Sequence, residues 1–208
     1  MKTSVCIAIS LDGFIAREDG RIDWLPSGNA AADGEDYGYK DFMRAVDQLV
    51  MGRKTYETAL GFDEWPYGTM PVVVLSSRAL NIPKHIAGSV ESMSCAPAEL
   101  IQVLAKRGAT RLYIDGGATI QSFLKAGLIQ QITITRIPVL IGSGISLFGK
   151  LDHDITLHHI DTRQFPSGLF GAHMRFPHSQ ALWQPREGGS SEVIVRRSRG
   201  AAVRKGSP

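Results

Sequence analysis

Residues 111–119 read RLYIDGGAT and join a short apolar run to an amphipathic one through two glycines. The apolar run predicts a strand over residues 111–114, and the apolar spacing after the glycines predicts a helix over residues 118–126. Paired glycines at such a junction let a pyrophosphate approach the backbone N–H groups that open the helix. A tight turn that needs a positive φ is the alternative explanation of these glycines. On either reading, the stretch predicts one strand–turn–helix unit.

The same alternation continues outward along the chain. Apolar and β-branched runs predict strands over residues 4–10, 48–51, 71–75, 111–114 and 131–137, and amphipathic spacing predicts helices over residues 36–46, 53–60, 97–106 and 118–126. Residues 154–164 and 169–176 predict two more strands, joined as a hairpin through the sequence PSG at residues 166–168. The sequence therefore predicts an α/β fold with a mostly parallel central sheet, helices on both faces and an antiparallel C-terminal hairpin edge.

Two other strand ends carry residues that suit an anion, and in such sheets ligands bind outside the carboxyl ends of the strands. The segment MGRKT at residues 51–55 places two cations at a helix start, where the helix dipole disfavours them unless an anion is bound. The segment LSSR at residues 75–78 offers two hydroxyls and a guanidinium, which suit a phosphate monoester. A solvated first turn and a polar turn are the alternative readings of these two segments.

Composition and motifs exclude several classes of protein. The chain has 208 residues, 43 % of them hydrophobic, and no apolar run near the ~20 residues that a membrane span needs. Residues 5–9 are too short an apolar run for a signal peptide, and two cysteines do not make a disulfide scaffold, so we expect a cytoplasmic location. The histidines lack metal-ligand spacing, so no metal is expected. No P-loop, Rossmann fingerprint or nucleophile elbow occurs.

The net charge of +3 divides unevenly along the chain. Residues 177–208 are rich in Ser, Gly and Arg and carry six basic and two acidic residues, which leaves a net charge of −1 for residues 1–176. We therefore expect a single domain over residues 1–176 and a basic, disordered tail over residues 177–208. A solvated tail is favoured over one that contacts nucleic acid, so a nucleic-acid partner is not expected.

Glu35 and Asp36 stand at the start of the helix predicted over residues 36–46. A carboxyl group in a cleft can donate or relay a proton if burial raises its pKa. The usual role of an acid at this position is to cap the helix, and position alone favours capping.

Taken in order, these segments resemble the dihydrofolate reductase superfamily over residues 3–176. The segment AISLDGFIA at residues 8–16 and the segment IPVLIGSG at residues 137–144 look most like the reductase domain of bacterial riboflavin biosynthesis. The segments MGRKTYE at residues 51–57 and VLSS at residues 74–77 look more like dihydrofolate reductase itself, while IDGGA at residues 114–118 is shared. The resemblance implies the three-layer fold of that superfamily.

The resemblance also implies NADPH as the cofactor, with the 2′-phosphate near the cations and the pyrophosphate at the paired glycines. The residues that it assigns to the cofactor are Ala8, Ile15, Gly52, Arg53, Lys54, Thr55, Leu75, Ser76, Ser77, Arg78, Ile114, Gly116, Gly117, Ala118 and Thr119. Asp36 falls on the catalytic acid of the folate enzyme, and Thr135 falls on the threonine that holds that acid and the pterin.

Lys40 occupies a position where the folate enzyme has an apolar aromatic residue, which favours an anionic substrate such as a ribose phosphate. Trp24 would flank the ring of the substrate or pack the loop. The predicted activity is NADPH-dependent reduction of a pyrimidine ribosylamine resembling 5-amino-6-(5-phosphoribosylamino)uracil, or of a pterin. A true dihydrofolate reductase and a catalytically silent nucleotide-binding protein are the alternatives. Relatives of the riboflavin type also lead us to expect a homodimer.

Overall fold

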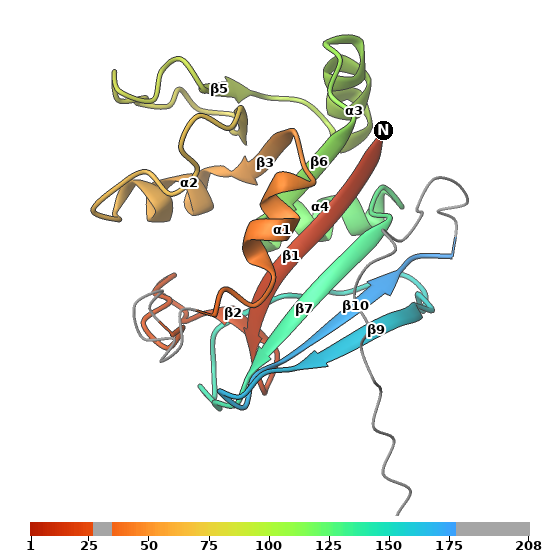
Figure 1. The fold of residues 1–208 in the computed structure, drawn as a ribbon. Coiled ribbons are helices and arrows are strands. Elements are labelled where there is room, and N and C mark those ends of the chain that lie inside the picture. Colours follow the sequence, from red (N-terminus) through yellow and green to blue (C-terminus); the bar gives the residue numbers. More distant parts are fainter. Residues whose placement is uncertain (27–34, 178–208) are drawn as a thin grey trace, which may run out of the picture.

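Eight strands form one sheet that is parallel through its middle and antiparallel at one edge (Figure 1). The computed structural model describes residues 1–26 and 35–177. In order across the sheet, the strands are β5 (Val90–Met93), β4 (Val72–Leu75), β3 (Gln48–Gly52), β6 (Arg111–Asp115), β1 (Lys2–Ser10), β7 (Gln131–Ile137), β10 (Phe170–Arg175) and β9 (His158–Gln164). Neighbours from β5 to β7 pair in parallel, and β10 runs antiparallel to β7 and β9. The predicted sheet and its hairpin edge are confirmed.

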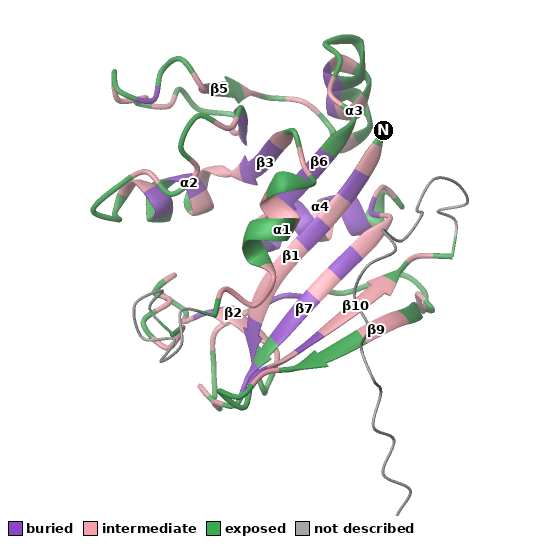
Figure 2. Cartoon of the chain, in the orientation of Figure 1, coloured by how far each residue is buried: buried purple, intermediate pink, exposed green. Residues whose placement is uncertain are grey.

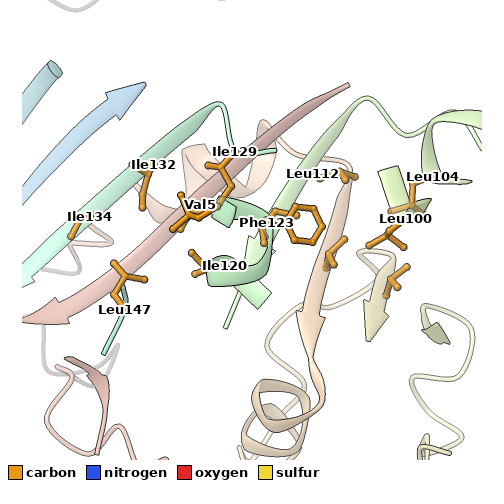
Figure 3. Packing of buried hydrophobic residues seen from close by; sticks show 14 of the residues in the cluster. Val5, Leu100, Leu104, Leu112, Ile120, Phe123, Ile129, Ile132, Ile134 and Leu147 are labelled. Atoms are coloured by element: carbon orange, nitrogen blue, oxygen red, sulfur yellow. The ribbon is translucent and has the colours of Figure 1, made fainter. Parts of the chain in front are cut away.

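Helices cover both faces of the sheet, as predicted. α3 (Pro97–Lys106) and α4 (Gly117–Lys125) pack on one face, and α1 (Tyr39–Arg44) and α2 (Arg53–Leu60) pack on the other. Successive side chains of a strand point to opposite faces, so Val50 belongs to the core under α3 and α4, whereas Leu49 belongs to the core under α1 and α2. Figure 2 shows the buried positions along these strands, and Figure 3 shows Phe123 of α4 packed against the sheet.

A second, two-stranded sheet joins the loops that follow β1 and β7. It consists of β2 (Phe14–Ala16) and β8 (Ile145–Ser146), which are too short for a sequence pattern to reveal. Oδ2 of Asp12 accepts hydrogen bonds from the N–H groups of Ile141 (3.1 Å) and Gly142 (2.8 Å) and holds the two loops together. This small sheet places β2 beside the start of α4.

The structure corrects two predicted elements. The helix predicted over residues 36–46 begins only at Tyr39, because Tyr37 and Gly38 adopt positive φ angles of 56° and 81°, which a right-handed helix does not allow. The strand predicted over residues 154–164 begins only at His158. β5 was not predicted, because its exposed Glu91 and Ser92 interrupt the apolar run.

The predicted tail lies outside the described residues, except for Pro177. Within residues 1–26 and 35–177, no helix has the length and apolar character needed to span a membrane.

Candidate functional site

The three segments predicted to bind phosphate meet at one edge of the sheet. β3 lies between β4 and β6, with Gly52 opposite Leu75 and Met51 opposite Asp115. The carboxyl ends of the three strands are therefore adjacent, and the turns that follow them form one surface. The structure thus brings together the residues that the sequence assigned to the cofactor from these three turns.

Two of these turns open directly into helices whose first N–H groups are uncapped. Gly52 precedes α2 and Gly116 precedes α4, and among the described residues no side chain caps either helix. A Cβ on Gly116 would collide with Oγ1 of Thr55, and one on Gly52 would lie 2.9 Å from Oγ1 of Thr119. The glycines therefore let the two helix starts approach closely. Paired, uncapped helix starts are suited to a pyrophosphate.

An apolar side chain of β2 lies at the same edge. A Cβ on Gly117 would lie 2.7 Å from Cδ1 of Ile15, so the side chain of Ile15 rests on the start of α4. Ala8 is half-buried on the neighbouring strand β1. Both residues border the surface at which a nicotinamide ring is expected. Ile114, in contrast, is fully buried in the hydrophobic core, so its side chain is not available to a ligand.

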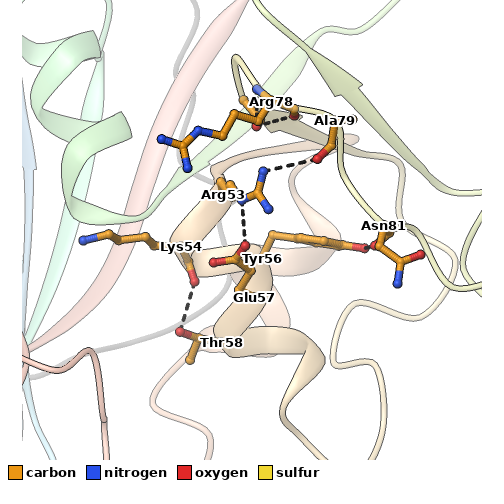
Figure 4. A network of polar contacts seen from close by, with 9 residues as sticks. Arg53, Lys54, Tyr56, Glu57, Thr58, Arg78, Ala79 and Asn81 are labelled. Carbon is orange, nitrogen blue, oxygen red and sulfur yellow. Dashed lines mark hydrogen bonds and ion pairs between the residues drawn. The ribbon is translucent and has the colours of Figure 1, made fainter.

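The cations near this surface differ in how far they are already engaged (Figure 4). Arg53 donates from Nε to Oε1 of Glu57 (2.6 Å) and from a terminal nitrogen to the carbonyl oxygen of Ala79 (3.2 Å). Among the described residues, the exposed side chains of Lys54 and Arg78 have no such partner, and in Figure 4 they extend to the same side of α2. Lys54 and Arg78 are therefore the cations left free for a phosphate.

The hydroxyl groups predicted to bind the phosphate are also used unequally. Oγ of Ser76 donates to the carbonyl oxygen of Arg78 (2.7 Å) and accepts from its N–H group (3.1 Å), so it shapes the turn after β4. The hydroxyl of Ser77 is on an exposed residue, whereas Thr119 is buried between the two helix starts. Ala118, which the resemblance also assigns to the cofactor, is exposed.

A cavity of about 150 Å³ adjoins this edge on the face that carries α1. Its sheet wall consists of residues that directly face one another across neighbouring strands. One row is Cys6, Thr133, His173 and Asp161, and the next is Ala8, Thr135, Gly171 and Arg163. All of them except Ala8 line the cavity. Since Ala8 pairs with Thr135, the cavity and the expected nicotinamide surface are contiguous.

The opposite wall of the cavity comes from the segment that leads into α1. Tyr37, Gly38, Asp41 and Phe42 line it, and the ring of Tyr37 meets that of Phe165 edge-on at a centroid distance of 5.0 Å. Three aromatic rings and several charged side chains thus surround a space that is large enough for a small ring.

Of the residues predicted to act on the substrate, only Thr135 lines this cavity. Asp36 accepts hydrogen bonds from the N–H groups of Lys40 (2.7 Å) and Gly38 (3.2 Å), and the first of these contributes most to lowering the pKa of its carboxyl group. Asp36 thus accepts an N–H group of the first turn of α1, which is the capping role that its position in the sequence favours. Lys40 is exposed, and Trp24 is half-buried with its indole N–H unpartnered among the described residues.

Asp115 is an acid that the sequence motif contained but that the predicted site omitted. It is half-buried at the carboxyl end of β6, and burial raises the pKa of its carboxyl group to about 6, even though the N–H of Gly116 (2.8 Å) and the hydroxyl of Tyr67 stabilise the ionised form. Burial, and then the charge of Asp115, raise the pKa of the Cys6 thiol to about 12. Because Cys6 lines the cavity, Asp115 lies close to both the cavity and the glycine turn. The feature of the sequence that could have identified Asp115 is an acidic residue at the end of an otherwise apolar strand.

Comparisons with known proteins agree with this geometry. The family model of the RibD C-terminal domain matches residues 2–170. "Uncharacterized protein YwjB" of Bacillus subtilis (strain 168) is 36% identical over 167 residues, which are 79% of this chain and 92% of that protein. The crystal structure of a "Putative riboflavin biosynthesis protein" from Shewanella sp. PV-4 matches with a TM-score of 0.77 and 38% identity, covering 85% of this chain and 99% of that one.

A further solved structure supports the likeness of fold. Dihydrofolate reductase from Enterococcus faecalis, complexed with NADP(H), matches with a TM-score of 0.57 and 18% identity, covering 85% of this chain and 96% of that one. The chain therefore belongs to the RibD C-terminal domain family, a reductase family with the fold of dihydrofolate reductase.

Proposed function

We propose that the chain is an NADPH-dependent reductase whose substrate is a small nitrogen heterocycle, with a pyrimidine ribosylamine resembling 5-amino-6-(5-phosphoribosylamino)uracil as the first choice. The observation that carries this proposal is the contact between two surfaces of different chemistry. Uncapped helix starts suited to a dinucleotide adjoin, through Ala8 and Thr135, a cavity lined by aromatic and charged side chains. A reductase needs its cofactor and substrate side by side in this way.

The residues at the sheet edge fit the parts of NADPH. The N–H groups that open α2 and α4 would hold the pyrophosphate, and Lys54 and Arg78 would hold the 2′-phosphate that NADH lacks. Ala8 and Ile15 would border the nicotinamide ring. When bound, the cofactor would supply the hydride.

The cavity is large enough for a single ring and is open to solvent on one side. A cavity of about 150 Å³ is comparable to one that accommodates benzene in another protein. One six-membered heterocycle therefore fits between the sheet and Tyr37, while the rest of the substrate would extend outward. A pyrimidine and a pterin both present one six-membered ring to this space, and the pterin remains the alternative substrate.

Reduction of a C=N bond also requires a proton at the nitrogen, and the pKa of Asp115 makes it the better suited of the two candidate acids. Its raised pKa keeps a fraction of the carboxyl groups protonated near neutral pH, whereas the lowered pKa of Asp36 keeps that group ionised. In this proposal Asp115 holds the proton, and the hydroxyl of Thr135 orients the ring.

Replacing Arg78 by alanine should weaken NADPH binding about 10- to 100-fold and leave NADH binding almost unchanged. The physical reason is the loss of charge-assisted hydrogen bonds to the 2′-phosphate. Titration of both cofactors by fluorescence or calorimetry measures the effect. Arg107→Ala, which removes the same charge beyond the C-terminal end of α3, is the control and should bind both cofactors normally. Equal losses of NADPH and NADH affinity in Arg78→Ala would contradict the assignment.

Replacing Gly171 by valine tests the position of the substrate. The position has ordinary strand geometry, and a Cβ there would lie 3.6 Å from both Phe165 Cε2 and Thr135 Oγ1, which is normal contact. The two methyl groups of valine would then occupy the cavity, so KM for the pyrimidine should rise about tenfold or more, by loss of one favourable ring contact. NADPH affinity should stay the same.

The matched control for this variant is Gly171→Ala, whose single methyl group fits and whose KM should be close to that of the wild type. Steady-state kinetics on both variants provide the comparison. A normal KM in Gly171→Val would place the substrate elsewhere.

A further inference from the structure

The sheet wall of the cavity contains a histidine whose two ring nitrogens are in different environments. Nδ1 of His173 on β10 lies 3.2 Å from Oδ1 of Asp161, the residue directly opposite on β9. The carboxylate favours a proton on Nδ1, because that proton faces a negative charge. A neutral imidazole with its proton on Nδ1 has Nε2 as a hydrogen-bond acceptor. The side chain is only 23% exposed and lines the cavity.

The surroundings keep this ring neutral. Burial, as the largest influence, lowers the pKa of His173, and the positive charges of Lys2 and Arg163 act in the same direction. Asp161 opposes the shift. The other titratable groups that line the cavity are Cys6 on β1, Asp41 on α1 and Tyr37 in the segment that leads into α1. At neutral pH the ring is therefore an acceptor for a ligand in the cavity.

Arg163 completes the recognition surface. Its Nε lies 3.6 Å from Oδ2 of Asp161, so one carboxylate contacts both His173 and Arg163. The guanidinium has five N–H donors and no acceptor, and Arg163 also lines the cavity. The wall thus presents an acceptor on β10 beside donors on β9. Its complement is a ring edge with an N–H group next to a carbonyl oxygen, that is, a cyclic amide.

We propose that His173, oriented by Asp161, is a specificity-determining residue that accepts a hydrogen bond through Nε2 from a ring N–H of the substrate, with Arg163 donating to the adjacent carbonyl oxygen. This inference rests on the proposed function, because it takes the cavity as the substrate site. It adds the residue that recognises the substrate, His173, and the group of the substrate that is recognised, a ring N–H.

The test is a double-mutant cycle between protein and ligand. The probes are 6-aminouracil and its 1-methyl and 3-methyl derivatives, titrated by calorimetry in the presence of saturating NADP⁺, so that no turnover occurs. One of the two ring nitrogens, N1 or N3, carries the N–H group that donates to His173. In the wild type, methylation of that nitrogen should weaken binding at least tenfold more than methylation of the other ring nitrogen, because the methyl group removes the hydrogen-bond donor. His173→Leu preserves the bulk of the side chain without an acceptor, so it should lose this preference. His173→Gln, whose amide oxygen can accept, should regain part of it.

His158→Leu is the matched control, because His158 is an exposed histidine on the neighbouring strand β9 and does not line the cavity. It should behave as the wild type. An equal methylation penalty in wild type and His173→Leu overturns the assignment of His173, and failure of all three uracils to bind the wild type overturns the cyclic-amide edge. NADP⁺ affinity, measured in the same titrations, separates both results from failure of the reductase proposal, which would appear as loss of cofactor binding in the wild type.

Discussion

Turnover should fall about 10²-fold or more when Asp115 is replaced by asparagine, because the amide cannot deliver the proton that accompanies hydride transfer. In the wild type, kcat should decrease as pH rises through about 6, the pKa to which burial raises this carboxyl group. Asp115→Asn should lack that decrease. A pH–rate profile of both proteins, at saturating cofactor and substrate, measures both effects.

Asp36→Asn is the matched comparison, since it makes the same change in the other candidate acid. An asparagine oxygen can still accept the N–H groups of Gly38 and Lys40, so only a small loss of turnover is expected. A large loss in Asp36→Asn, together with an unchanged pH profile in Asp115→Asn, would show that Asp36 is the proton donor after all.

The same substitution should change stability with a defined sign. The folded-state pKa of Asp115 lies above the value near 3.9 expected in the unfolded chain, so its contribution is fully present below pH 4 and is lost as pH rises through about 6. Above that pH, the ionised carboxylate costs up to about 3 kcal/mol. At pH 8, Asp115→Asn should therefore be more resistant to urea than the wild type, and this advantage should shrink as pH falls. An advantage that is constant with pH would contradict the pKa assignment.

Replacing Gly116 by alanine should lower NADPH affinity roughly 100-fold or more and destabilise the fold by about 2–4 kcal/mol. The φ of 86° strains any L residue, and the added Cβ would push Thr55 away and separate the starts of α2 and α4. Both helix starts would then present their N–H groups at the wrong spacing for a pyrophosphate. Cofactor titration and urea unfolding measure the two effects.

Gly108→Ala separates these two causes. Gly108 has a similar φ of 92°, but a Cβ there would meet nothing within 4 Å. This variant should therefore lose only the stability associated with backbone strain, about 1–3 kcal/mol, and should bind NADPH normally. If Gly116→Ala bound NADPH as well as Gly108→Ala, the paired helix starts would not be the pyrophosphate site.

Much of the fold follows from local patterns. The apolar runs and the glycine turn at residues 114–118 predicted the parallel sheet and the helices on its two faces, because β-strand and helix periodicities are properties of short segments. The late start of α1 could not be predicted in this way. It depends on the positive φ angles of Tyr37 and Gly38, next to a ring contact with Phe165 from the distant hairpin.

The candidate site also has one part that local patterns predict and one part that they do not. The cofactor edge was predictable, since its turns directly follow apolar strands. The cavity was not, because Arg163 and His173 reach it only through the register of β9 and β10 with β7. Polar residues in such strands also read as ordinary solvent-facing positions. The local pattern, an acid that ends an apolar strand, marks the position of Asp115, but its raised pKa depends on burial by residues far away in sequence.

The proposed reductase activity is tested most directly by mixing the protein with NADPH and 5-amino-6-(5-phosphoribosylamino)uracil and following both compounds. Loss of the reduced-nicotinamide absorbance reports the cofactor, and mass spectrometry reports the pyrimidine. We expect NADPH to be oxidised in equal amount to the pyrimidine reduced, and much faster than NADH. NADPH that binds tightly but is oxidised with neither this pyrimidine nor dihydrofolate would contradict the proposed activity and identify a nucleotide-binding protein without reductase activity.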